Sequence, residues 1–103
     1  MVKVNWTQNA IQDLNDIGDY ISKDSIRYSE LTIEKLFYSV DILEQHPFAG
    51  KMVLEFEDET IRELIKGNYR IVYHIIDDDN IEILTVNNCA RLISNSSAFL
   101  DKD

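Results

Sequence analysis

The sequence is poor in cysteine, proline and glycine, with one, one and three of these among its 103 residues. A single cysteine excludes an intramolecular disulfide framework, and so little glycine and proline argues against a loop-rich scaffold. No apolar run approaches the roughly 20 residues that span a bilayer. The first ten residues lack the apolar stretch and the small-residue cleavage site of a signal peptide. We therefore expect a cytoplasmic protein with no membrane contact.

Positive charge is also scarce, because 10 lysines and arginines stand against 19 acidic residues, for a net charge of −9. A field of that sign repels phosphate, so the chain alone is not expected to bind nucleic acid directly. The hydrophobic content of 45% is that of a globular protein. The length predicts a single domain over residues 1–103, with a polar, weakly patterned tail at 92–103 that frays.

Two helices are predicted after a short N-terminal strand. Val2–Trp6 alternates apolar and polar residues, and Thr7 is placed to cap the helix that follows. The first helix is indicated by apolar residues at spacings of four, three and four, namely Ala10, Leu14, Ile17 and Ile21. A second helix begins after Ser25 and runs to about Gln45, before Pro47. A connection this short makes the two helices an antiparallel hairpin.

The second helix has two apolar faces. The face expected in the core comprises Ile33, Leu36, Phe37, Val40 and Leu43. The nearly opposite face comprises Tyr28, Leu31, Tyr38 and Ile42. Exposed apolar rows of this kind mark interfaces, and tyrosine suits them because it buries a ring while its hydroxyl stays in water. The alternative is that the first helix wraps far enough round to cover part of this second face.

The rest of the chain predicts strands at 61–66, 69–76 and 81–87, with 52–56 as a further short strand. We expect Lys66 to pair with Tyr69 and Asp77 with Asn80 in the two hairpins. Residues that pair across neighbouring strands lie on the same face of the sheet, so these registers assign every side chain to one of its two faces. The face for the helices then holds Leu64, Ile71, Tyr73, Ile75, Leu84 and Val86, with Arg62 near its edge. The other face holds Glu63, Ile65, Arg70, Val72, His74, Ile83, Thr85 and Asn87. The expected architecture is α+β, in the order β-α-α-β-β-β, with the helical hairpin on one face of a mainly antiparallel four-stranded sheet.

No catalytic signature is present, since the sequence has no HExxH, CxxC, GxSxG or glycine-rich phosphate loop. The acidic clusters at 55–59 and 77–79 lack the spaced ligands and the glycine of a calcium loop, so solvated turns are expected there. Neither a metal nor a cofactor is expected. For His74, packing across the strands is favoured over chemistry.

Two arginines carry more information, because basic residues are so few. Arg62, at the edge of the core face, is expected to be structural and to pair with an aspartate of the first helix such as Asp16. Arg70 points to the other face, where its guanidinium could bind a phosphate group. Pairing with Glu63, diagonally across the hairpin, is an equally good interpretation.

Several segments, in their order and spacing, resemble the RelE/ParE toxin superfamily of type II toxin–antitoxin systems. They are Trp6-Thr7…Ala10…Asp13-Leu14…Ile17…Tyr20-Ile21, Pro47…Gly50-Lys51, Ile61-Arg62-Glu63-Leu64…Tyr69-Arg70-Ile71-Val72-Tyr73, and Ile83-Leu84-Thr85-Val86 with Arg91. The resemblance covers nearly the whole chain, from Val4 to about Leu92. It implies the same β-α-α-β-β-β fold that the periodicity predicts.

The resemblance implies one of two activities. RelE-like members cut mRNA in the ribosomal A site with basic residues on the open sheet face and a tyrosine or histidine near the C-terminus, whereas ParE-like members poison DNA gyrase through a protein contact. Arg70 matches the arginine of the RelE-like enzymes, so Arg70, Asn88 and Arg91 are the catalytic candidates for a nuclease. However, Glu63 stands where those enzymes carry lysine, Asn88 where many carry histidine, and no tyrosine follows Arg91. These departures, with the long helical hairpin and the turn at 47–51, favour the ParE-like branch.

The family also implies a partner, an antitoxin whose C-terminal segment wraps the toxin. Its expected contacts are Tyr28, Leu31, Tyr38, Ile42, Arg70 and His74. Because this chain is acidic, we expect that segment to carry Lys or Arg at its rim, with apolar anchors between them. The acidic balance departs from both branches, whose members are often basic, so an antitoxin-binding module without activity is a third hypothesis. A homodimer also stays open.

Overall fold

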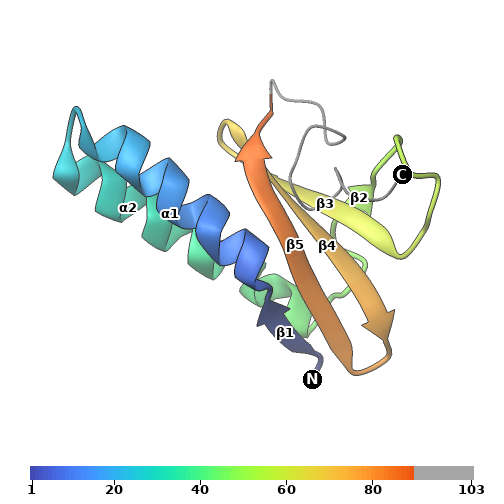
Figure 1. Ribbon diagram of the computed structural model, residues 1–103. Helices are drawn as coiled ribbons and strands as arrows, with labels where there is room; N and C mark the ends of the chain where they lie inside the picture. Colours follow the sequence, from blue (N-terminus) through green and yellow to red (C-terminus); the bar gives the residue numbers. More distant parts are fainter. Residues whose placement is uncertain (90–103) are drawn as a thin grey trace.

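Two helices form a hairpin against one face of a five-stranded sheet (Figure 1). The computed structural model describes residues 1–89. Its elements in chain order are β1 (Lys3–Trp6), α1 (Gln8–Ser22), α2 (Ile26–Tyr38), the 3₁₀ helix η1 (Ser39–Glu44), β2 (Lys51–Met52), β3 (Ile61–Lys66), β4 (Tyr69–Asp77) and β5 (Asn80–Asn88). The strand order is β1-β5-β4-β3-β2, with β1 parallel to β5 and every other pair antiparallel.

The α+β architecture predicted from the sequence is confirmed, with one difference in the sheet. The sheet has five strands rather than four, because the short strand β2 pairs with Arg62 and Glu63 of β3. The strand expected at 52–56 is therefore real but shorter, and it begins one residue earlier. The predicted fraying of the tail at 92–103 lies outside the described residues.

Side-chain caps begin both helices where the sequence predicts them. Thr7 Oγ1 accepts a hydrogen bond from the amide of Ala10 at 3.2 Å, and Ser25 Oγ accepts one from the amide of Tyr28 at 3.0 Å. Each cap satisfies an amide that has no partner inside the first helical turn. Thr7 Oγ1 also donates to the carbonyl of Ile83 at 2.6 Å, so the cap fixes the start of α1 against β5.

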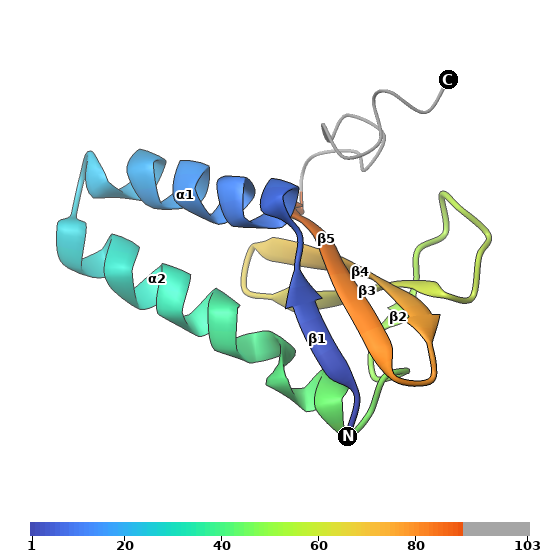
Figure 2. The ribbon, with the colours of Figure 1, turned by 60° about the horizontal axis from the view of Figure 1, so that its bottom comes forward.

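The helical hairpin extends beyond the sheet (Figure 2). Its two helices approach closely at Gly18, whose carbonyl oxygen accepts a hydrogen bond from Ser29 Oγ at 2.7 Å. The second helix tightens into η1 and ends at Glu44, next to the predicted end at Gln45. None of the helices in residues 1–89 is long and apolar enough to cross a membrane.

The hairpin registers match the prediction, but a bulge changes the faces along β5. Lys66 pairs with Tyr69 and Asp77 pairs with Asn80. Between Val72 and Tyr73 the partners jump from Thr85 to Ile83, so Leu84 is an extra residue. Between this bulge and a second irregularity at Ile75–Asp77, the side chains of β5 lie on the face opposite to the one predicted, whereas those of β4 keep their predicted faces. The expected positions of Ile83 and Leu84 are therefore wrong, since Ile83 joins the core under the helices and Leu84 lies on the other face.

The main core lies between the helices and the sheet. Its buried members are Ala10, Leu14, Leu36, Val40, Leu43, Ile71, Tyr73, Ile75, Ile81, Ile83 and Val86. Phe37, which the helical pattern assigned to the core, is 44% exposed. Its ring stacks on Trp6 with the centroids 5.4 Å apart, because α2 turns Leu36 rather than Phe37 toward the sheet.

A smaller apolar cluster covers part of the other sheet face. Val53 and Val72 are fully buried there, and Phe56, Ile61 and Leu84 pack against them. The segment after β2 therefore folds back over β3 and β4. This placement brings the acidic run at 55–59 to the sheet face that the sequence assigned to binding.

Candidate functional site

The second apolar face of α2 is exposed along its whole length. Tyr28 is 62% exposed, Leu31 51%, Tyr38 58% and Ile42 50%. The alternative, in which α1 covers part of this row, does not occur, because α1 packs on the other side of α2 through residues such as Ser29. We call Tyr28, Leu31, Tyr38 and Ile42 the α2 stripe.

A groove runs between the α2 stripe and the turn that joins β3 to β4. The part of the groove near Tyr28, its upper part, has a volume of about 470 Å³. It is lined by Tyr28, Leu31, Lys35, Lys66, Tyr69 and their neighbours. A second hollow continues past Leu31 and Lys35 to Tyr38. Burial of the Tyr69 hydroxyl at the groove wall raises its pKa above the ordinary value. Apolar walls with a few polar groups are typical of a binding groove.

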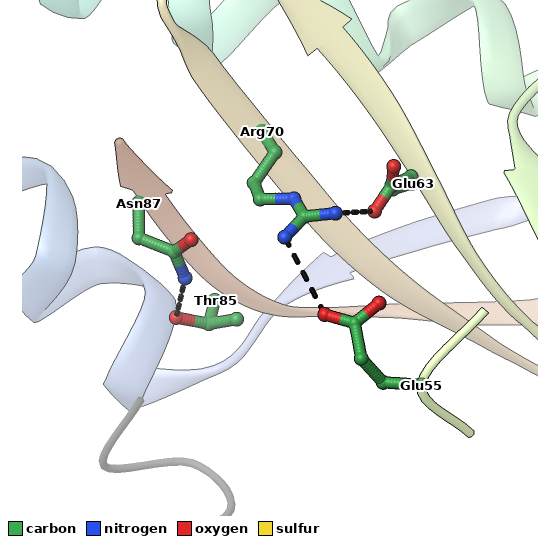
Figure 3. Close-up of polar contacts among 5 residues, drawn as sticks. All are labelled: Glu55, Glu63, Arg70, Thr85 and Asn87. Atoms are coloured by element: carbon green, nitrogen blue, oxygen red, sulfur yellow. Dashed lines mark hydrogen bonds and ion pairs between the residues drawn. The ribbon is translucent and has the colours of Figure 1, made fainter. Parts of the chain in front are cut away.

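On the open sheet face, Arg70 is bound by two carboxylates. Its guanidinium donates from one nitrogen to Glu63 Oε2 at 2.7 Å, and another nitrogen lies 3.6 Å from Glu55 Oε2 (Figure 3). The Glu63 side chain is only 5% exposed and that of Arg70 15%. Of the two interpretations of Arg70, pairing with Glu63 is the one observed. Because these carboxylates neutralise the guanidinium and occupy its hydrogen-bond donors, Arg70 is poorly placed to bind a phosphate group.

Asn87 and Thr85 lie beside Arg70 on the same face of the sheet (Figure 3). Asn87 pairs with Arg70 across the strands, is 5% exposed, and donates from Nδ2 to Thr85 Oγ1 at 3.4 Å. Thr85 Oγ1 in turn donates to the carboxylate of Asp13, which also accepts from the amide of Val86 at 3.0 Å. The Asp13 contacts tie α1 to the edge of β5 and are structural in character.

The remaining candidates are spread over the molecule. His74 is half-buried and lies opposite Glu82 of β5, and Asn88 is exposed at the end of β5. Neither lies directly across the strands from Arg70, whose partners in the ladders are Ile65 and Asn87. Arg91 lies outside the described residues. Of the three nuclease candidates, the structure therefore places Arg70 and Asn88, on adjacent strands.

Arg62 binds differently from the prediction. Its Nε donates to the carbonyl of Glu59 at 2.9 Å, a terminal nitrogen donates to the carbonyl of Gly50 at 2.8 Å, and its guanidinium lies 4.8 Å from the Phe48 ring centroid. The expected pair with Asp16 is wrong, because β3 lies two strands away from β5, against which α1 packs. Arg62 instead joins the two loops on either side of β2.

The acidic clusters form turns, as the sequence indicates. Asp58 accepts hydrogen bonds from the amide and the hydroxyl of Thr60, and Asp77 accepts from the amide of Asp79. These bonds favour the charged carboxylates and lower the pKa of both Asp58 and Asp77. Within residues 1–89, no group of three potential metal-binding side chains comes together.

Two features of the site were not anticipated from the sequence. Glu55 reaches Arg70 only because the segment after β2 folds back over the sheet. Lys35 and Lys66 line the same groove although they are 31 positions apart in the chain. The spacing of Lys35, four residues after Leu31 on the exposed face, was the one available signal for the second feature.

The sequence matches the ParE toxin family of the parDE type II toxin–antitoxin system over residues 4–93. Protein Y4kP of Sinorhizobium fredii, which is named as a toxin, is 33% identical over 86 residues, or 82% of this chain and 84% of that protein. Toxin RelE2 of Caulobacter vibrioides is 28% identical over 92 residues, or 89% of this chain and 100% of that protein.

Two solved structures share the fold. The chromosomal ParDE system from P. aeruginosa superposes with a TM-score of 0.69 at 21% identity, covering 85% of this chain and 96% of that one. The toxin–antitoxin complex RelBE2 from Mycobacterium tuberculosis gives a TM-score of 0.52 at 24% identity, covering 84% and 96%. Because the family match spans nearly the whole chain, the protein belongs to the ParE toxin family of type II toxin–antitoxin systems, within the RelE/ParE superfamily.

Proposed function

We propose that this toxin acts in the ParE-like manner, by inhibiting DNA gyrase through a protein contact, and that a cognate antitoxin neutralises it. The observation that carries the proposal is the pairing of Arg70 with carboxylates. A ribonuclease must stabilise the extra negative charge of a pentavalent phosphate with positive charge held ready in the site. Here the matching arginine is engaged by Glu63 at 2.7 Å and flanked by Glu55 at 3.6 Å.

The charge of the whole open face supports the same choice. Its carboxylates, those of Glu55, Glu63 and Glu82, outnumber its cations, Arg70 and Lys51. A phosphate approaching this face would meet net negative charge at short range, where little solvent screens it. Inhibition through a protein surface needs no such cluster of cations.

The antitoxin is proposed to dock on the α2 stripe, with Arg70 and His74 as contacts on the open face. The stripe is at least half exposed at each of its four residues, and the groove beside it supplies a concave surface. Exposed apolar surface of this extent is costly unless a partner covers it. From the net charge, the antitoxin segment is proposed to carry Lys or Arg at its rim.

The test is to induce the toxin alone in a bacterial host and to follow two readouts in the same culture. Plasmid supercoiling reports gyrase, and mapping of mRNA 5′ ends reports cleavage on ribosomes. We expect growth arrest with loss of supercoiling and no new 5′ ends. Site-specific A-site cuts that disappear in Arg70→Ala would overturn the proposal in favour of a RelE-like nuclease. Lys23→Ala, which removes an exposed cation at the end of α1 away from the open face, is the control.

An antitoxin-binding module without toxic activity is favoured by one observation, the net charge of −9 in a family whose members are often basic. It predicts normal growth after induction, together with a tight complex with the product of the adjacent gene. Growth arrest of either kind would exclude it.

A further inference from the structure

The groove beside the α2 stripe has a charge opposite to that of the chain. Two lysines, Lys35 on α2 and Lys66 at the end of β3, line its upper part, and no carboxylate does. Both lysines are exposed. The second hollow is lined by the same two lysines and, on its other side, by Glu34. In a chain with 19 acidic and 10 basic residues, a row of lysines along one side of the groove differs from its surroundings.

The other side of the α2 stripe is acidic. At about 100° per residue around the helix axis, Leu31 lies between Lys35 on one side and Glu34 on the other. Glu30 precedes Glu34 by one turn, and both are exposed. Arg27 is the cation at the N-terminal end of this outer row. The stripe is thus an apolar strip with lysines toward the sheet and glutamates toward the outside.

We infer that the groove binds an amphipathic segment of the antitoxin that has two charged edges: carboxylates facing Lys35 and Lys66, and Lys or Arg facing Glu30 and Glu34. This inference rests on the proposed antitoxin partner. The apolar anchors of the segment lie on Leu31 and the tyrosines of the stripe, and the two edges fix its direction and rotation. From Tyr28 to Tyr38 the helix rises about 15 Å, which is room for roughly ten residues of a partner helix.

The net charge alone predicts a basic rim, and the groove refines this prediction. The basic side chains belong only on the outer edge, because a second basic row would face Lys35 and Lys66. Like charges in direct apposition oppose binding and are one way in which an interface rejects wrong partners. A segment turned end for end or rotated in the groove would bring those like charges together.

The experiment uses calorimetry, at low and at high salt, to measure the affinity of this toxin for the purified protein encoded by the adjacent gene. One variant reverses the groove lysines, Lys35→Glu with Lys66→Glu. A second reverses the outer glutamates, Glu30→Lys with Glu34→Lys. We expect each to weaken binding about tenfold or more at low salt, with a smaller effect in about 1 M salt, where screening is strong.

Matched controls make the same changes of net charge at exposed positions that do not line the groove. Lys3→Glu with Lys23→Glu matches the first variant, and Asp19→Lys with Asp24→Lys matches the second, since all four positions are exposed. We expect the controls to stay within about threefold of the wild type, because their side chains do not line the groove and act on the segment only through solvent. Thermal melts of all four variants establish that each is folded.

Three outcomes would overturn the inference and leave the antitoxin partner intact. They are tighter binding by the variant with reversed lysines, an unchanged affinity in either groove variant, and losses that the controls reproduce. A self-associating wild type that the groove variants convert to monomers would assign the groove to a second copy of this chain. If the folded wild type forms no complex with the adjacent gene's product, the antitoxin proposal itself fails, and this inference with it.

Discussion

The hydroxyl of Tyr73 joins the chain on both sides of one turn: it accepts a hydrogen bond from the amide of Gly50 at 2.9 Å and donates one to the carbonyl of Pro47 at 2.8 Å. Tyr73 is fully buried in the middle of β4. Its ring belongs to the core under the helices, and its hydroxyl provides the partners that the turn after η1 would otherwise lack. A core side chain therefore fixes the loop that leads into β2.

Removing this hydroxyl should destabilise the fold and change its response to alkali. Tyr73→Phe leaves the buried amide of Gly50 without an acceptor, which should lower the free energy of unfolding by about 1–3 kcal/mol. Burial raises the pKa of Tyr73 above 10.0, so above that pH the folded protein retains a proton that the unfolded chain loses. The free energy of unfolding of the wild type should therefore fall as pH rises through about 10.

Urea unfolding between about pH 8 and pH 10.5 measures both effects, because the difference between the two proteins isolates this tyrosine. The difference in free energy of unfolding between the wild type and Tyr73→Phe should become smaller as pH rises. A gap that stays constant over this range would mean that the pKa of Tyr73 is not raised.

Gly50→Ala should be destabilising because no space exists for a methyl group. A Cβ at Gly50 would lie 2.6 Å from the carbonyl oxygen of Glu63 and 2.7 Å from the hydroxyl of Tyr73. Overpacking of this kind costs about 1–3 kcal/mol. Gly18→Ala is the control, since its Cβ would meet the flexible side chain of Ile33 at 3.3 Å inside a helix. Equal melting temperatures for the two variants would contradict the prediction.

Arg70→Met should cost about 3–5 kcal/mol, because it leaves the buried carboxylate of Glu63 without its cation. Adding Glu63→Leu to Arg70→Met should recover most of that loss, since the uncompensated charge is then gone. Chemical denaturation of the two single variants and the double variant gives the coupling directly. Simple additivity would show that the pair is not coupled.

Two leucines on the same helix make a matched test of the core. Leu36 is 2% exposed and Leu31 51%. Leu36→Ala should lower the free energy of unfolding by about 2–5 kcal/mol, whereas Leu31→Ala should change it by less than about 0.5 kcal/mol. A loss below about 1 kcal/mol for Leu36→Ala would mean that α2 is rotated from the orientation described.

Leu31→Asp with Ile42→Asp should abolish binding of the antitoxin without unfolding the domain. Both side chains are about half exposed, so charge is tolerated in the free protein but not beneath an apolar anchor. Circular dichroism reports the fold and calorimetry the binding. Wild-type affinity in this variant would remove the α2 stripe from the interface.

Local chemistry made much of the fold predictable. The caps at Thr7 and Ser25 and the hairpin pairs Lys66–Tyr69 and Asp77–Asn80 depend on neighbours in the sequence, and each is observed. The bulge at Leu84 is different, because it is offset by a second irregularity in β4 between Ile75 and Asp77, so that the register is the same at both ends of the two strands. No residue at that point signals the extra position.

The site was predictable to the extent that it depends on one element. Helical periodicity predicted the second apolar face of α2 and left open whether α1 covers it, and the structure shows that face exposed. The partners of Arg62 and the second carboxylate at Arg70 depend on how the segment after β2 folds back, which is set by packing of Val53 and Phe56 on the sheet. Contacts of that kind have no periodic signature, and for Arg62 the sequence led to the wrong partner.

The parallel pairing of β1 with β5 has a consequence for the order of events during synthesis. Lys3 lies beside Asn80, its partner 77 positions later in the chain. At about 5–20 residues per second, a ribosome needs roughly 4–15 s to supply that partner. During this interval the strand edge of β1 is unpaired, and the apolar side chains of α1 that rest on β5 have no sheet to cover them. A nascent chain stalled before residue 80 can therefore complete neither the sheet nor the core, and the toxin fold becomes available only when translation of the domain is almost finished.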